Sequence, residues 1–179
     1  MNIHQRCSFI FLSFLFFSLY LNGQEGGSVD LSDSSQIEIL KEHNKYRWAL
    51  GLSDLVYSSA LQYEAEVWAR NLAIKDKMYH DRKNRNHGEN LAWANYAISG
   101  KDAVGIWGSE RSDYNHFTHR SVNVTGHYTQ IVWESTTKVG CASSVSDSGK
   151  HYWVCRYDPP GNFVEQKPFK AISFIKYLQ

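Results

Sequence analysis

His127 is the residue of this sequence whose chemistry most needs a partner. It lies in residues 126–135, where aromatic and β-branched side chains predict a strand. The two-residue period of a strand places His127 on one face with Thr129, Ile131 and Trp133. The opposite face also carries large apolar groups, so we expect a central strand that is covered on both sides. A buried imidazole must form hydrogen bonds through its ring nitrogens, so His127 requires a polar neighbour.

Glu110 raises the same question for a carboxylate. A helix is predicted to begin near residues 99–102, and its apolar stripe contains Ala103, Trp107, Glu110 and Tyr114. A carboxylate on a face meant for burial must be paired or hydrogen-bonded, or a shift of its pKa neutralises it. Histidine and glutamate in such positions suit proton transfer or the binding of a divalent cation.

Two further histidines, His80 and His87, lie in a polar segment, residues 76–88, which we expect to form a loop just before Glu89. The zinc-protease motif HExxH and the serine-hydrolase motif GxSxG are absent from the sequence. Histidine and glutamate together could polarise a water molecule, but the sequence does not predict an enzyme.

The length of 179 residues suits one domain with a substantial core. Residues 9–21 are apolar except for two serines and follow Arg6, which predicts a signal peptide over residues 1–23 and a secreted chain without a membrane span. A retained signal anchor is the alternative. Of the 19 basic residues, loss of Arg6 leaves 18 against 18 acidic residues. A chain with no net charge is not expected to bind nucleic acid.

The cysteines predict one disulfide. Cys7 falls in the signal peptide, and the remaining pair in a secreted chain, Cys141 and Cys155, favours a bond over two free thiols or a metal pair. The turn-forming residues 146–150 predict a hairpin that sets the two cysteines opposite each other. Closing this loop stabilises the fold by roughly 3 kcal/mol in the entropy model. Asn123 begins the sequence's one glycosylation sequon.

Two more helices precede these elements. One is expected to begin at Ser34 or Ser35 and to end by Gly51, after a loose leader at residues 24–33. The second begins after a cap at Ser58 or Ser59. Helices followed by antiparallel strands predict an α+β domain.

Five motifs, in order along the chain, resemble signatures of the CAP superfamily, which contains cysteine-rich secretory proteins, insect antigen 5 allergens and plant pathogenesis-related proteins. They are HNKYR at 43–47, HGENLAW at 87–93, GIWGSE ending at Glu110, GHYTQIVWEST at 126–136 and YWVCRYDPPGNF at 152–163. The resemblance covers residues 34–179 and implies a three-layer α-β-α sandwich with a small antiparallel sheet between helices. The single domain is similar to the venom-allergen-like proteins of parasitic worms.

The resemblance also implies a central cavity lined by two histidines and two glutamates. The matching residues are His80, Glu89, Glu110 and His127, with His87 as an alternative to His80. These donors suit Zn²⁺ or another divalent cation, although no cofactor is expected to be obligatory. Alternatively, the four groups satisfy one another by hydrogen bonds.

A lipid ligand is the function that the resemblance implies. Some relatives bind sterols at the loop that corresponds to residues 112–124, and others hold a fatty acid between two helices. The candidate contacts here are Trp107, Tyr114 and Phe117 for a sterol, and Ile37 and Leu40 for a fatty acid. Ordinary core packing is the alternative for the aromatic residues. The chain is therefore expected to be a secreted, non-catalytic lipid-binding protein, or else an effector that binds an extracellular protein.

Overall fold

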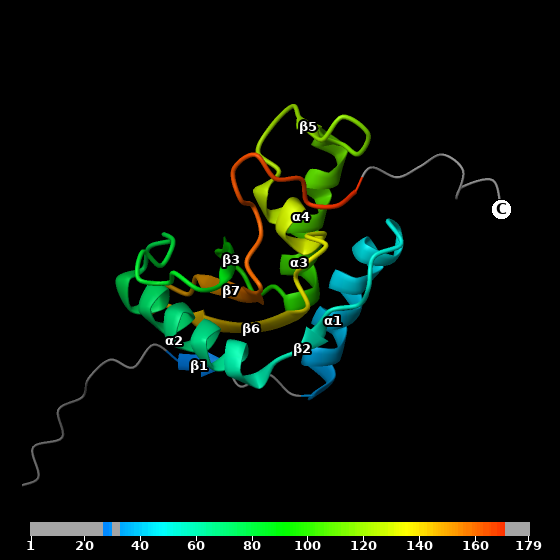
Figure 1. Cartoon of the computed structure of the whole chain (residues 1–179). Coiled ribbons are helices and arrows are strands. Elements are labelled where there is room, and N and C mark those ends of the chain that lie inside the picture. Colours follow the sequence, from blue (N-terminus) through cyan, green and yellow to red (C-terminus); the bar gives the residue numbers. More distant parts are fainter. Residues whose placement is uncertain (1–26, 30–32, 171–179) are drawn as a thin grey trace, which may run out of the picture.

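The computed structural model describes residues 27–29 and 33–170 of the chain (Figure 1). The predicted signal peptide and the tail from residue 171 lie outside this part. The helices are α1 (Asp33–Trp48), α2 (Ser59–Lys75), α3 (Gly100–Ser109), the 3₁₀ helix η1 (Glu110–Asp113) and α4 (Gly126–Ile131). The strands are β1 (Gly27–Val29), β2 (Val56–Tyr57), β3 (Gly88–Ala94), β4 (Tyr114–Asn115), β5 (Arg120–Ser121), β6 (Lys138–Val145) and β7 (His151–Asp158).

Three layers make up the domain, as the resemblance implied. The central sheet has the order β1-β6-β7-β3, and the short β2 joins β6 in parallel, so the sheet is mixed rather than purely antiparallel. Helix α2 covers one face, and α1, α3 and α4 cover the other (Figure 1). The α+β prediction is confirmed.

Each face of the sheet has its own core. Along β6 and β7, Cys141 and Trp153 pack towards α1, α3 and α4. Their neighbours Ala142 and Val154 pack towards α2. This alternation is the two-residue period of strands that are buried on both faces. A residue on either strand can therefore contact one helical layer but not both.

Local signals start two of the helices where they were expected. The Ser58 hydroxyl accepts a hydrogen bond from the Leu61 N–H at the start of α2. At the start of α3, the Ser99 hydroxyl accepts from the Asp102 N–H, and the Asp102 carboxylate accepts from the Ser99 N–H. This reciprocal capping box satisfies two donors that a helix end otherwise leaves open.

The β6–β7 hairpin also agrees with its prediction. Cys141 lies directly opposite Cys155 in the antiparallel register, and the two residues form a disulfide across 14 positions of sequence. The turn between the strands contains Gly149, whose φ of +83° is a conformation that glycine adopts readily.

The prediction of a strand over residues 126–135 is wrong. Gly126–Ile131 form the short helix α4, and the chain then turns towards β6. His127 therefore lies on a helix at the edge of the α1, α3 and α4 layer, and its side chain is 31% exposed rather than buried. The aromatic and β-branched residues of this segment instead fill the core between α4 and the sheet, which contains Tyr128, Ile131 and Val132.

Residues distant in sequence cap both ends of α4. The Glu110 carboxylate accepts hydrogen bonds from the N–H groups of His127 and Tyr128, both at 3.0 Å. Near the other end, the Arg47 guanidinium donates to the carbonyl oxygens of Ile131 and Trp133. Tertiary contacts thus satisfy the backbone of a helix too short to be stable by itself.

The stretch expected to be a loose leader contributes to the sheet. Residues 27–29 form β1, which pairs with β6 in antiparallel register, and α1 begins at Asp33. Within the described residues, no helix has the length and apolar character needed to cross a membrane.

Candidate functional site

Two separate histidine–glutamate pairs make up the candidate site. In the first pair, His127 Nδ1 lies 2.6 Å from Glu110 Oε1. The Trp107 ring is stacked against the imidazole, with an interplanar angle of 23°. Glu110 Oε2 is already engaged by the two backbone N–H groups of α4, so both carboxylate oxygens hold this pair in place.

The second pair is part of a larger charged network. His80 Nδ1 lies 2.5 Å from Glu89 Oε1, and Glu89 faces Arg156 across the β3–β7 ladder. Arg156 Nη1 lies 2.7 Å from Glu89 Oε2, and the two charged groups form an ion pair. These two atoms do not form a hydrogen bond with each other. Arg156 Nη2 does form a hydrogen bond, with Asp81 Oδ2 at 2.9 Å. The Arg156 and Glu89 side chains are only 2% and 7% exposed, so each charge compensates the other in a buried place.

The structure pairs His80, rather than His87, with Glu89. His87 lies against Glu64 of α2, with 2.8 Å between Nδ1 and Oε2. The hydrogen bond to Glu89 raises the pKa of His80 above its ordinary value, because the carboxylate favours the charged imidazole. His87 is thus the partner of a different acid, and His80 keeps its predicted neighbour.

The contacts define which atoms a metal ion could use. An ionised carboxylate only accepts hydrogen bonds, so the Nδ1 of each paired imidazole must donate, and the neutral ring presents its lone pair at Nε2. Metal-binding histidines are commonly oriented by a carboxylate in this way. In each pair, Nε2 is therefore the ring atom that could bind a metal ion, and Glu89 and Glu110 orient the rings.

The four predicted residues do not form a single tight ligand set. Within residues 27–29 and 33–170, one group of three or more His, Cys, Asp or Glu has its ligand atoms all within 4.8 Å of one another: His43, Cys141 and Cys155. The sulfurs of that group are joined as a disulfide and have no thiolate to offer a metal. The four residues therefore form two separate pairs, and the shared cavity that the resemblance implies stays a prediction.

The sequence reasoning missed Arg156 and Asp81, although a signal for Arg156 was present. Tyr152 and Val154 alternate along β7 and pack against α2, so the same period places Arg156 on a buried face. A charge at such a position requires a buried partner. The partner on β3 could not be known without the strand register.

The predicted lipid contacts divide into core and surface residues. Trp107 is 1% exposed and donates its indole N–H to the Leu91 carbonyl, and Tyr114 is 6% exposed. In contrast, Phe117 and Ile37 are about half exposed, at 56% and 51%. Leu40 is partly buried and packs against the core of the α1 side.

A cluster of rings holds the loop that follows η1. The Tyr114 hydroxyl pairs with His119 Nδ1 at 2.8 Å, and His116 Nε2 pairs with the Tyr128 hydroxyl at 2.7 Å. Phe169, near the end of the described chain, contacts both imidazoles. Burial lowers the pKa of His116 and His119, which favours the neutral form of both rings. The base of this loop is therefore ordered by side-chain packing.

Comparisons with known proteins agree with this architecture. The chain matches the Cysteine-rich secretory protein family, CAP, over residues 40–157. Pathogenesis-related protein 1 of Arabidopsis thaliana is 36% identical over 137 residues, which cover 76% of this chain and 83% of that protein. Venom allergen-like protein 4 of Schistosoma mansoni has a similar structure, with a TM-score of 0.67 at 24% identity, covering 82% of this chain and 99% of that one. NaASP2, whose structure was determined with Zn²⁺, has a TM-score of 0.65 at 22% identity and covers 82% of this chain and 92% of its own.

Proposed function

The chain belongs to the CAP family of cysteine-rich secretory proteins, and we propose that it is a secreted, non-catalytic member that binds a sterol or a related lipid at the loop between η1 and α4. The apolar segment at residues 9–21 and the disulfide support secretion. The exposed Asn123 side chain suits the glycosylation predicted for its sequon.

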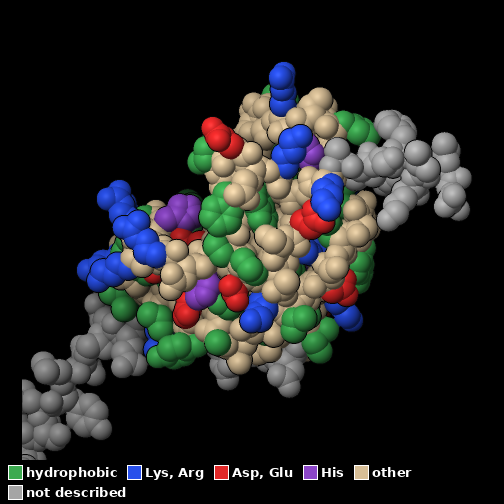
Figure 2. Space-filling model, viewed as in Figure 1, with side chains coloured by type: hydrophobic (Ala, Val, Ile, Leu, Met, Phe, Trp, Pro, Cys, Tyr) green, Lys and Arg blue, Asp and Glu red, His purple; other side chains and the backbone are tan. Residues whose placement is uncertain are grey.

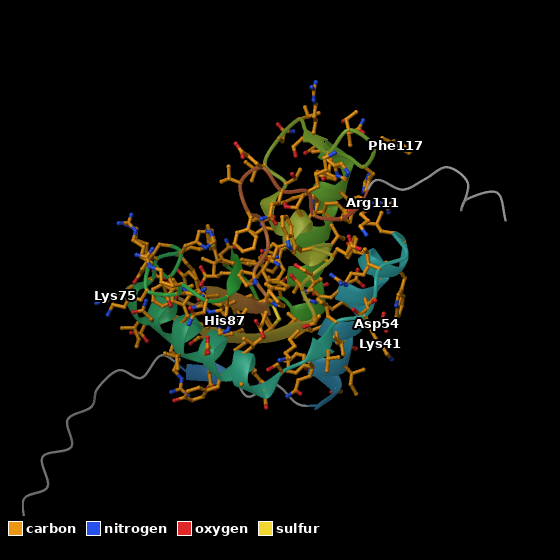
Figure 3. All side chains as sticks on the ribbon, viewed as in Figure 1. Lys41, Asp54, Lys75, His87, Arg111 and Phe117 are labelled. Carbon is orange, nitrogen blue, oxygen red and sulfur yellow. A yellow bond between two sulfur atoms is a disulfide. The ribbon has the colours of Figure 1, made fainter. Side chains whose placement is uncertain are left out.

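The observation that carries the lipid proposal is the set of exposed apolar side chains on this loop. Phe117, Val122 and Val124 are 56%, 86% and 78% exposed. Apolar groups gathered on one loop often mark a binding surface. Phe117 projects from the upper right of the molecule (Figure 3). An apolar ligand would gain about 25 cal/mol for each Å² that it buries against these groups.

A hollow beside the loop gives such a ligand room. It has a volume of about 460 Å³ and lies between the loop and residues 162–168. Tyr114, Phe163 and Pro168 provide apolar walls, while Thr118 and Ser121 provide hydroxyl groups near them. A sterol, with a flat apolar body and one hydroxyl, matches this mixture of contacts better than a linear chain does.

Replacing Phe117 by alanine is expected to weaken the binding of labelled cholesterol by about 60-fold, because the ring supplies roughly 100 Å² of apolar contact. The matched control is Tyr63→Ala, which removes a similarly exposed aromatic side chain from α2. The measurement is equilibrium binding at micromolar protein. Absence of sterol binding by the wild type would reject the proposal and leave the protein-binding effector as the better reading. Native mass spectrometry of the purified protein would independently detect a retained lipid.

A divalent cation is the second candidate ligand, supported by the two carboxylate-oriented imidazoles. NaASP2, the fold relative determined with Zn²⁺, favours zinc as the ion to test. The two Nε2 atoms would hold the ion, and water would complete its coordination.

Calorimetry with Zn²⁺ is expected to show binding that is at least about tenfold weaker in His80→Ala and in His127→Ala, since each loses an imidazole ligand. His151→Ala, on β7, is the matched control. Protonated imidazole cannot bind a metal, and the pKa of His80 is raised, so its contribution should already fall as the pH drops below neutrality. Equal heats from the wild type and both variants would remove the zinc proposal.

A further inference from the structure

A basic surface forms where α2 ends and the chain turns towards β3. Five cations lie within eleven residues of sequence there: Lys75, Lys77, Arg82, Lys83 and Arg85. All five are exposed, and none forms an ion pair with another residue of the described chain. Lys and Arg side chains gather at the left of the molecule, over the end of α2 and the following loop (Figure 2). We name these five residues the basic loop surface.

The acidic residues of the same segment do not neutralise this surface. Asp76 accepts hydrogen bonds from Lys150 Nζ, the Ser148 hydroxyl and the Tyr152 hydroxyl. Asp81 pairs with the buried Arg156. Asp76 is thus held by the β6–β7 hairpin, whereas Asp81 lines both hollows of this surface and has its charge offset there by Arg156. The near-zero net charge of the whole chain therefore conceals a local excess of positive charge.

Two hollows give this surface a concave shape. One, of about 760 Å³, contains Lys75, Lys77, Arg82 and Lys83 in its lining, and the other, of about 500 Å³, contains Lys83 and Arg85. The Trp68 and Tyr79 rings, packed edge to face, lie in the larger hollow beside the Asn71 amide. Cations, aromatic rings and an amide in one groove provide contacts for anionic groups, for ring faces and for hydroxyl groups.

The loop is held in place before any ligand arrives. Asp76 ends α2 in the left-handed conformation and is anchored to the hairpin by its three hydrogen bonds. Asn84 accepts from the His87 N–H and donates to the His87 carbonyl, which closes the far side of the loop. Binding to an ordered surface costs less conformational entropy than binding to a flexible one.

We propose that the basic loop surface binds a sulfated polysaccharide. The cations would contact sulfate and carboxylate groups along the chain, and Trp68 and Tyr79 would contact the faces of the sugar rings. An anionic membrane is a poorer fit, because the cations line grooves that a flat bilayer cannot enter. The surface is distinct from the proposed lipid loop: Lys75 lies at the left of the molecule and Phe117 at the upper right (Figure 3).

Heparin is the probe for the experiment, with completely desulfated heparin as the control ligand. Wild-type protein is expected to bind heparin at physiological salt, to release it as salt rises, and not to bind the desulfated chain. The triple variant Lys75→Gln/Lys77→Gln/Lys83→Gln is expected to bind at least about tenfold more weakly. All three side chains are exposed, so the variant should fold as the wild type does.

The matched control removes the same charge elsewhere. Lys41→Gln/Lys101→Gln/Lys170→Gln replaces three other exposed lysines and should retain wild-type affinity. Three results would overturn the proposal: no heparin binding by the wild type, equal losses in both triple variants, or binding only to phosphatidylserine vesicles. Because these variants leave Phe117 and the two histidine–glutamate pairs intact, failure here would be independent of the sterol and zinc experiments.

Discussion

Replacing Arg47 by leucine is expected to lower the free energy of unfolding by more than about 3 kcal/mol, because it leaves several buried carbonyl groups without a donor. The guanidinium donates through Nε to the Ser53 carbonyl, through Nη1 to those of Ile131 and Trp133, and through Nη2 to that of Thr136. Arg47 has no exposed surface. Burial lowers its pKa to about 10, so the group is still charged at neutral pH.

These contacts explain why the effect should be large. Arg47 lies on α1, and three of its acceptors belong to the segment that carries α4 towards β6. Each unsatisfied buried carbonyl costs about 1–3 kcal/mol, so even partial relaxation leaves a substantial loss. Leucine fills some of the space but donates no hydrogen bond, so the segment after α4 would lose its connection to α1.

The experiment is urea unfolding of the wild type and the variants, which measures the free energy of unfolding and its dependence on urea concentration. The free energy of unfolding of Arg47→Lys should lie between those of the wild type and Arg47→Leu, because one ammonium keeps the charge but cannot reach all four acceptors. The control Arg85→Leu removes an exposed guanidinium and should change stability by less than about 0.5 kcal/mol. A loss below about 1 kcal/mol in Arg47→Leu would contradict the assigned role.

The long-range contacts of Arg47 could not be predicted from the sequence, whereas elements that depend on local contacts could. The helices α2 and α3 carry their own start signals at Ser58 and Ser99, and both helices begin where they were expected. The hairpin could also be predicted from the sequence, because a turn midway between two cysteines defines the register by itself. Local chemistry was sufficient for these elements.

The conformation of α4 was predicted wrongly because it does not depend on local contacts alone. Its residues have strand propensity, and its caps come from Glu110 and Arg47, which lie far away in sequence. Tertiary hydrogen bonds decided the conformation against local preference. The same dependence on the folded chain hid the Glu89–Arg156 ion pair, which needs the β3–β7 register. Glu110 was correctly identified as a carboxylate in need of a partner, and its partners include the backbone of the helix that the sequence did not predict.

Acid is expected to destabilise the protein through His43, by about 2 kcal/mol between pH 7 and pH 5. The ring is completely buried on α1, with Nδ1 2.8 Å from the Ile39 carbonyl and Nε2 2.8 Å from the Tyr157 hydroxyl. A carbonyl only accepts, so Nδ1 donates to it, and Nε2 of the neutral ring accepts from Tyr157. Burial lowers the pKa of His43 to about 4.

The sign follows from comparing the folded and unfolded chains. Between pH 6.5 and about 4, the unfolded chain binds a proton at His43 and the folded chain does not, so stability rises with pH across this window. The stabilisation by neutral His43 is therefore present above pH 6.5 and is lost progressively as the pH falls to about 4. His80 acts in the opposite direction, because its pKa is raised: its contribution is present below its unfolded pKa and is lost as the pH rises through the folded value.

Urea unfolding at pH 7 and pH 5 measures this effect, and His43→Gln isolates it. Glutamine can keep one donor and one acceptor in the same place but does not titrate. Between pH 7 and pH 5, the free energy of unfolding of His43→Gln should therefore change by about 2 kcal/mol less than that of the wild type. All other ionisable groups are the same in both proteins, so their contributions cancel in the comparison. His151→Gln is the control and should follow the wild type. An equal pH dependence in wild type and His43→Gln would mean that His43 is not the group through which acid acts.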